Sequence, residues 1–191
     1  GEAKTEMWHV LDAAPGAGIF AGFKPGVNEA ALDAALRDKT VQDILNFIPI
    51  RPGDAFFIPG GRVHAIGEGC LLYEVQQNSN TTFRLYDWDR VGPEGKPRPL
   101  HVEQARQVIR WQDSAPVKVD ARPLPDESGA QRWLVTESAY FRMERLALSG
   151  AWRNAARGQG FEILFVVSGH VKIGGESLPA NPGYSISELP P

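Results

Sequence analysis

The sequence lacks several features that would place it in other classes of protein. Cys70 is the one cysteine in 191 residues, which excludes an internal disulfide and a cysteine-rich zinc site. No apolar run approaches the length of a membrane-spanning helix, and no secretory signal pattern is visible. Lys and Arg total 20 against 23 Asp and Glu, so there is no positive excess for nucleic acid or an anionic membrane. We expect a cytoplasmic protein that binds neither.

Segments with helical periodicity are scarce, whereas turn-forming residues are plentiful. The chain has 20 Gly and 15 Pro, and its 42% hydrophobic residues are enough to build a core. The pattern predicts helices at 28–38 (with Asn28 as N-cap), 41–46 and 101–111. It predicts strands at 6–12, 17–24, 47–50, 55–58, 70–77, 81–86, 117–121, 132–137, 141–148, 161–167 and 170–173. The first two strands are expected to form a hairpin, residues 87–99 a loop, and 168–169 the turn of a second hairpin between 161–167 and 170–173.

The most informative stretch is residues 53–84. It places Gly53, Pro59, Gly61 and His64 in the spacing G-x5-P-x-G-x2-H, which resembles the second conserved block of the cupins, the small double-stranded β-barrels. Each residue has a physical role: Gly53 and Gly61 allow tight turns, and Pro59 ends a strand by removing a backbone donor. A neutral imidazole at His64 is a common metal ligand. Alone, a histidine after such a turn is more often structural, but the full spacing favours a metal site.

The resemblance implies a mainly β fold, a jelly-roll-like cupin barrel, in two cupin-like units. Residues 1–111 would form the first unit, with the active site and a short helical insertion at 28–46. Residues 112–191 would form a second, metal-free and incomplete unit. Its markers are Glu162 and Gly169, which match the tail of the first cupin block without the preceding histidines, and Pro182-Gly183, which match the opening turn of the second block.

Three motifs give a narrower resemblance. They are KTEMW at 4–8, PGGRVHAI at 59–66 and EVQQNSNTTFRLYDWDR at 74–90. Together they resemble the type I mannose-6-phosphate isomerases (phosphomannose isomerases), particularly the short bacterial form. The resemblance implies an aldose–ketose isomerase of carbohydrate metabolism that interconverts mannose 6-phosphate and fructose 6-phosphate through an enediol at a zinc ion.

The family's zinc ion has four protein ligands, two of which match this sequence as Glu6 and His64. The other two lie in a Gln-x-His-Pro strip upstream of KTE, which this sequence does not contain. Two ligands are too few for a tight zinc site. We therefore interpret the chain as a fragment of an enzyme that binds one Zn²⁺ per chain, with the remaining ligands supplied by an upstream segment.

The same resemblance assigns roles to four further residues. Arg84 would stabilise a developing oxyanion or orient the sugar, the alternative being a surface cation on an edge strand. Glu74, in the apolar strand LLYEVQQ, would be either a base with a pKa raised by burial or a structural carboxylate. Lys4 would be both a catalytic and a substrate-binding residue, and Lys4 and Arg90 would bind the dianionic phosphate, the alternative for both being ordinary exposed charges.

Two other functions compete with this one. A non-catalytic cupin module, which binds a sugar phosphate or serves as a scaffold, would have lost its metal together with the upstream ligands. A metal-dependent dioxygenase is disfavoured because the chain contains no His-x-His pair. The other histidines, His9, His101 and His170, are interpreted as structural or exposed.

Overall fold

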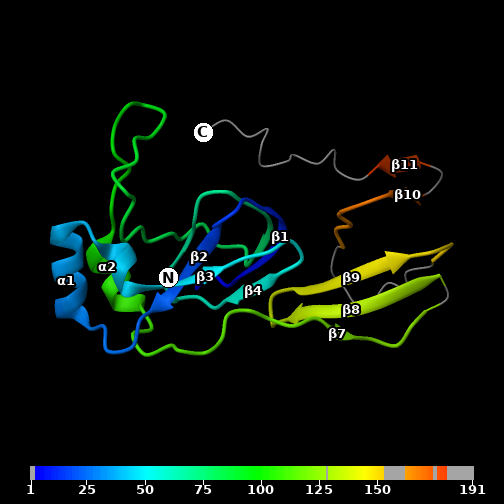
Figure 1. Ribbon diagram of the computed structural model, residues 1–191, viewed down its shortest axis with the longest axis horizontal. Coiled ribbons are helices and arrows are strands. Elements are labelled where there is room, and N and C mark those ends of the chain that lie inside the picture. The colour runs from blue at the N-terminus through cyan, green and yellow to red at the C-terminus, as the bar shows by residue number, and fades with distance from the viewer. Residues whose placement is uncertain (1–2, 128, 153–161, 174–175, 180–191) are drawn as a thin grey trace.

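The computed structural model describes residues 3–127, 129–152, 162–173 and 176–179, and is mainly β, as predicted (Figure 1). Its strands form four antiparallel sheets with two short α-helices at one end of the molecule. The sheets stay open: the described strands do not close into a single barrel. No helix of the described residues is long and apolar enough to cross a membrane.

Two three-stranded sheets form the part of the fold that carries the candidate site. The first has the order β4–β1–β6, from β1 (Glu6–Ala13), β4 (Ala55–Ile58) and β6 (Cys70–Gln76). The second has the order β3–β2–β5, from β2 (Gly18–Phe23), β3 (Leu45–Pro49) and β5 (His64–Ile66). The predicted hairpin between β1 and β2 is wrong, because the chain turns at 14–16 and then crosses to the other sheet.

Strand β1 is covered on both faces. Trp8 and Val10 face the second sheet and pack in one core cluster with Ile19 of β2 and Phe56 of β4. Met7 points the other way, into a cluster that includes residues of the β7–β8–β9 sheet described below. Met7, Trp8 and Val10 are each no more than 1% exposed. Full burial of such side chains stabilises the fold by about 1.5–3 kcal/mol each, which fixes the register of β1 and with it the direction of every side chain on the strand.

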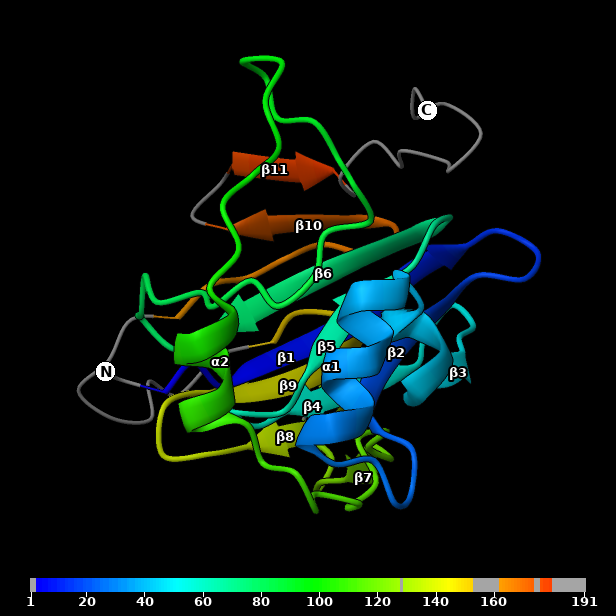
Figure 2. The ribbon, with the colours of Figure 1, turned by 90° about the vertical axis from the view of Figure 1, so that its left-hand side faces the viewer.

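The helices lie together at one end of the molecule, where Figure 2 shows them in front. Helix α1 (Glu29–Asp38) begins at the predicted N-cap, whose Asn28 Oδ1 accepts a hydrogen bond from Ala31 N at 3.0 Å. The second predicted helix is shorter than expected: the 3₁₀ helix η1 (Val41–Ile44) ends where Leu45 enters β3. Helix α2 (Val102–Val108) lies within the predicted 101–111.

The remaining strands form two smaller sheets. One has the order β7–β8–β9, from β7 (Arg122–Pro123), β8 (Ala130–Glu137) and β9 (Arg142–Leu148). The other pairs β10 (His170–Ile173) with β11 (Glu176–Pro179). The predicted hairpin partner of β10 is therefore wrong, since residues 162–167 form no strand.

The predicted strand at 117–121 is also wrong, because the segment makes only an isolated bridge at residue 118. The segment nevertheless joins the later part of the chain to β4. Phe57 N donates to Val117 O at 2.8 Å, and Val119 N donates to Ala55 O at 2.9 Å. Val117 is part of the core cluster around Trp8. The division at residue 112 stays a prediction, and Pro182-Gly183 lie outside the described residues.

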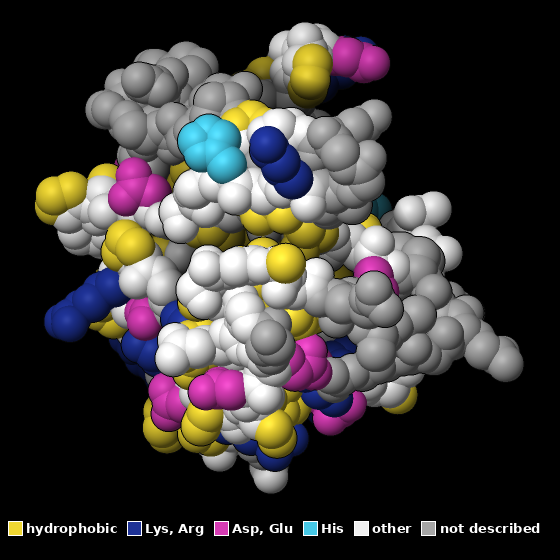
Figure 3. Space-filling view, turned by 90° about the vertical axis from the view of Figure 1, so that its right-hand side faces the viewer, with side chains coloured by type: hydrophobic (Ala, Val, Ile, Leu, Met, Phe, Trp, Pro, Cys, Tyr) yellow, Lys and Arg dark blue, Asp and Glu magenta, His cyan; other side chains and the backbone are white. Residues whose placement is uncertain are grey.

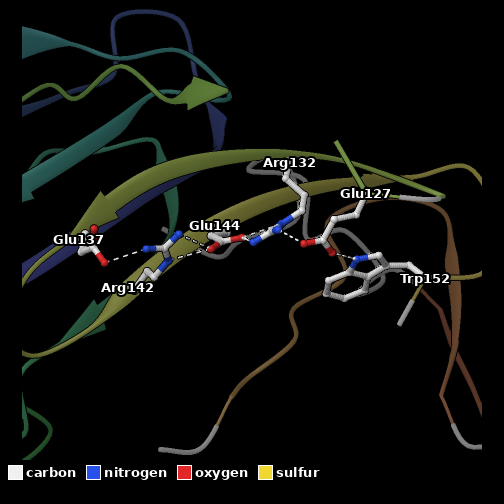
Figure 4. Close-up of polar contacts among 6 residues, drawn as sticks. All are labelled: Glu127, Arg132, Glu137, Arg142, Glu144 and Trp152. Atoms are coloured by element: carbon white, nitrogen blue, oxygen red, sulfur yellow. Dashed lines mark hydrogen bonds and ion pairs between the residues drawn. The ribbon is translucent and has the colours of Figure 1, made fainter. Parts of the chain in front are cut away.

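Strands β8 and β9 carry a network of paired charges, shown in Figure 4. Arg132 is 4% exposed and donates to Glu144 Oε2 at 2.6 Å and to Glu127 on its other side. Arg142 donates to Glu144 and Glu137, each at 2.7 Å. The indole of Trp152 donates to Glu127 Oε2 at 2.7 Å. On this end of the molecule, Figure 3 shows acidic and basic side chains interspersed with hydrophobic ones.

Candidate active site

The residues predicted to bind metal meet between the two larger sheets. Glu6 and Trp8 lie on the same face of β1, because alternate residues of a strand share a face. That face is opposite β5, where His64 is the first residue. Glu6 Oε2 lies 3.3 Å from His64 Nε2, and Glu6 Oε1 lies 2.8 Å from Lys4 Nζ. Three of the predicted site residues therefore come together in space.

The imidazole of His64 is held in a defined orientation. Its Nδ1 lies 2.8 Å from the carbonyl oxygen of Arg62, so Nδ1 carries a proton and donates to that oxygen. The ring also packs edge-on against Trp8, with centroids 5.3 Å apart. A metal-binding histidine characteristically donates its other ring N–H to a backbone carbonyl, which leaves Nε2 free for the ion. Nε2 is the atom that faces Glu6.

The contact between Glu6 Oε2 and His64 Nε2 is favourable only when a proton or a cation lies between the two atoms. With Nδ1 protonated, Nε2 of neutral His64 and Oε2 of ionised Glu6 are both acceptors. Either a second proton on the ring or a cation must therefore separate them. Two ligands of a tetrahedral zinc ion, at about 2.0–2.1 Å from the metal, lie about 3.3 Å apart, the separation seen here.

Glu6 is kept in the charged form that a metal requires. The residue is 2% exposed, and burial on its own would raise the pKa of its carboxyl group. Hydrogen bonds and positive charge from His64 and Lys4 outweigh burial, so the pKa of Glu6 lies below its usual value. Lys4 Nζ is anchored in turn by Gln76 Oε1 at 3.2 Å.

The donor set fits half of a zinc site. Glu6 and His64 have the identity, tautomer and spacing of two ligands, and no cluster of three or more His, Cys, Asp or Glu with metal-binding geometry occurs among the described residues. Further ligands would have to come from outside that part of the chain. That the ion is zinc, at one per chain, stays a prediction.

Gly61 has its predicted role in a turn, and both Gly60 and Gly61 also allow a close approach of other segments. Gly61 has φ of +85°, and a Cβ there would lie 2.5 Å from the carbonyl oxygen of Val108, at the end of α2. A Cβ on Gly60 would lie 2.7 Å from the side chain of Ala3, next to Lys4. The loop can therefore lie against both the segment that carries Lys4 and the end of α2 only with glycine at these positions.

Glu74 is placed differently from the expectation. It was predicted to be buried in an apolar strand, but it is exposed, because its face of β6 is open beside Trp8. Its Oε2 accepts a hydrogen bond from Trp8 Nε1 at 2.9 Å. The burial on which the predicted base role rested is therefore absent, the role itself stays a prediction, and the one described partner of Glu74 is an indole that touches His64.

Arg84 lies on a loop, so the predicted strand at 81–86 is wrong. Residues 81–86 form no strand, and their backbone hydrogen bonds run instead within the loop, as from Thr81 N to Ser79 Oγ at 3.3 Å, and to His101, which accepts from Arg84 N at 3.2 Å. The guanidinium of Arg84 lies 3.9 Å (Nε) from Asp87 Oδ1 and donates from Nη1 to Pro99 O at 3.2 Å. Within the described residues it makes no ion pair with Glu6, and its catalytic role stays a prediction.

Arg90 lies on the same loop. Its guanidinium carbon is 5.6 Å from the ring centre of Trp88, and its charge helps to lower the pKa of Asp87, for which the hydrogen bond from Arg98 is the largest cause. Its proposed contact with phosphate stays a prediction.

Three contributors were missed at the level of sequence: Trp8, Asp87 and Arg98. Trp8 could have been found, because it lies two residues from Glu6 on the same face of a predicted strand. The pairing of Asp87 with Arg98 joins two ends of a polar loop, and no periodicity signals it. His9 points away from this face, as expected, and burial lowers its pKa.

Comparisons with known proteins show what the chain as a whole is similar to. No protein-family model matches the chain. It is 38% identical over 148 residues to the mannose-6-phosphate isomerase ManA of Bacillus subtilis, a match that covers 78% of this chain and 46% of that protein. It is 35% identical over 153 residues to the mannose-6-phosphate isomerase of Streptococcus mutans, again covering 78% and 46%.

A solved structure of a mannose 6-phosphate isomerase is also similar to this chain. The crystal structure of the mannose 6-phosphate isomerase from Bacillus subtilis matches with a TM-score of 0.69 and 29% identity. The match covers 77% of this chain and 46% of that one. The chain thus spans about half the length of the curated relatives it matches.

Proposed function

Because this chain belongs to the mannose-6-phosphate isomerase family, we propose that the protein it represents interconverts mannose 6-phosphate and fructose 6-phosphate through an enediol. The observation that carries the proposal is the Glu6–His64 pair, two acceptor atoms 3.3 Å apart that a second ring proton or a bound cation must separate.

In this proposal Glu6 and His64 are two of the ligands of one Zn²⁺. The bound ion supplies a Lewis acid that stabilises negative charge on the two oxygens of the reacting carbons. Lys4 keeps Glu6 ionised and holds its Oε1, which leaves Oε2 free as a ligand. Arg62 O and the ring of Trp8 fix the plane of the imidazole.

The isomerisation moves a proton between C1 and C2 of the sugar. Arg84 would stabilise the oxyanion that develops or orient the sugar, as a fixed guanidinium does without needing a proton. Glu74 is exposed and therefore accessible to a ligand, and its bond to Trp8 fixes its position. Lys4 and Arg90 would meet the phosphate dianion, the ligand chemistry that suits both.

An assay on the native full-length protein tests the proposal. The protein is incubated with mannose 6-phosphate, and fructose 6-phosphate is detected with a coupled enzyme, before and after zinc is removed with a chelator and restored. We expect turnover that is lost with zinc and regained when zinc is added. Binding of mannose 6-phosphate without turnover would contradict the proposal and favour a sugar-phosphate-binding module.

A further inference from the structure

The turn that follows Arg84 has an unusual backbone. Within this turn, Trp88 and Asp89 have φ of 50° and 54°. Lys39, the residue after α1, has φ of 58°, and these three are the positive-φ non-glycine residues of the described chain. Lys39 Nζ pairs with Asp89 Oδ2 at 2.6 Å, and Trp88 Nε1 donates to Gln42 Oε1 at 3.1 Å. Residues other than glycine rarely adopt this backbone conformation, and it persists where several contacts enforce it. The turn is therefore pinned to the corner after α1.

This turn buries a carboxylate among arginines. Asp87 is 8% exposed, and Arg98 donates from Nε to its Oδ2 at 2.7 Å and from Nη2 to its Oδ1. Arg84 approaches the same Oδ1, and Arg90 lies close enough to influence its charge. One carboxylate facing three guanidinium groups leaves the cluster with a net positive charge. Neutralising Arg98 is therefore only part of the role of Asp87.

The backbone of Arg84 is fixed independently of Asp87. Arg84 N donates to His101 Nδ1 at 3.2 Å, and His101 N donates to Arg84 O at 2.7 Å. What remains to be oriented is the guanidinium. Pro99 O holds Nη1, and Asp87 lies beside Nε.

The other end of that guanidinium is open. The Arg84 side chain is 23% exposed, and in the described part of the chain its Nη2 has no protein acceptor. Pro99 O holds Nη1 and the carboxylate of Asp87 attracts the Nε edge from 3.9 Å, so the remaining N–H groups are presented in one direction. Such preorganisation is what a group that stabilises charge in a transition state needs.

We propose that Asp87, itself held by Arg98, is a positioning residue that aims the open Nη2 end of Arg84 at the substrate. The inference rests on the proposed isomerase function. Asp87 touches no substrate, since both of its oxygens accept hydrogen bonds from Arg98 and the residue is buried. Its effect on the reaction passes through Arg84.

The first test is Asp87→Asn in the native full-length protein. We expect kcat/KM for mannose 6-phosphate to fall about 10- to 100-fold, mostly through kcat, because a displaced catalytic group costs rate even when it is still present. Asp33→Asn is the matched control: it makes the same chemical change to a carboxylate that accepts from an arginine, Arg106, but it lies on helix α1 and is half exposed. We expect the control to stay within about twofold of the wild type.

A double-mutant cycle with Arg84→Lys separates positioning from general damage. Lysine keeps the charge but lacks the fork that Asp87 orients, so Asp87→Asn should cost no more than about twofold in that background. An equal loss in both backgrounds would overturn the inference, as would full activity of Asp87→Asn.

A second variant keeps the test decisive if Asp87→Asn does not fold. Arg98→Lys retains the charge and loses the two-point contact, and we expect kcat/KM to fall by about 3- to 10-fold. Unchanged activity would overturn the inference. A wild-type protein without isomerase activity would instead sink the proposed function, and the inference with it, before any variant is compared.

Discussion

Two polar clusters in this molecule are built from the same kinds of residue. In the site between the larger sheets, Glu6 is buried beside His64 and the indole of Trp8 donates to a glutamate. In the β8–β9 network, Arg132 is buried between two glutamates and the indole of Trp152 donates to one of them. Composition alone would not separate the two clusters.

The difference lies in how the partners match. Around Arg132, donors face acceptors on both sides, and Figure 4 shows a continuous chain of such contacts. Between Glu6 and His64, an acceptor faces an acceptor once the Nδ1 proton is committed to Arg62. The matched network is complete in itself, whereas the Glu6–His64 pair is completed only by a second ring proton or by a bound cation.

The largest effect that separates the clusters is on activity. Glu6→Gln keeps the shape of the side chain and removes its charge, so we expect isomerase kcat/KM to fall by roughly 1,000-fold. Glu144→Gln makes the same chemical change in the β8–β9 network and should leave kcat/KM within about twofold. Steady-state kinetics on both full-length variants measure this. Equal losses would show that the two clusters do not differ in function.

Stability should respond in the opposite way. Arg132→Met removes the buried cation that Glu127 and Glu144 share, which costs about 3 kcal/mol of unfolding free energy. Arg142→Met, in the same network but 38% exposed, should cost less than about 1 kcal/mol. Urea denaturation monitored by tryptophan fluorescence measures both. Similar costs for the two variants would contradict the assignment of Arg132 as the buried centre.

A smaller effect is expected in acid. Burial on its own would raise the pKa of Glu144, but hydrogen bonds from Arg132 and Arg142 outweigh it, so the pKa lies below its ordinary value of 4.5. The stability that Glu144 contributes is therefore fully present above pH 4.5 and is lost as pH falls through the lower, folded-state pKa.

Thermal melts of the wild type and Glu144→Gln between pH 7 and pH 3 test this. The difference in Tm between them should shrink below pH 4.5. A difference that stays constant across that range would mean that the charge of Glu144 is not what the arginines hold.

The two tryptophans give the smallest contrast. Trp8→Phe keeps the ring against His64 and removes the bond to Glu74, and we expect activity to fall a few-fold, about 3- to 10-fold. Trp152→Phe removes the bond to Glu127 and should cost about 1 kcal/mol of stability with activity unchanged. If Trp8→Phe retained full activity, the Glu74–Trp8 contact would be structural.

Local patterns predicted much of this fold. The strand at β4 and the N-cap at Asn28 lie where the sequence indicates, because alternation and capping are set by neighbouring residues. The β1–β2 hairpin was predicted wrongly, since a turn at 14–16 does not say whether the next strand pairs with the last one or joins the facing sheet. That choice depends on long-range burial of Trp8 and Ile19, which no local pattern contains.

The same division applies to the site. Lys4, Glu6 and His64 were predicted together and lie together, because motif spacing fixes which face of a strand each occupies. The predicted burial of Glu74 was wrong: apolar neighbours in sequence do not show that one face of β6 is open. The contact between Asp87 and Arg98 joins two loop positions, and only the folded chain reveals it.

The central claim is that His64 is a ligand of a zinc ion. The zinc content of the protein tests it most directly, because the chain offers a matched set of four histidines. The native full-length protein and its single variants His9→Ala, His64→Ala, His101→Ala and His170→Ala are dialysed against a weak chelator, and bound zinc is measured by elemental analysis. We predict about one zinc per chain in the wild type and in three variants, and a loss of most of it in His64→Ala. Zinc retained in full by His64→Ala would contradict the account.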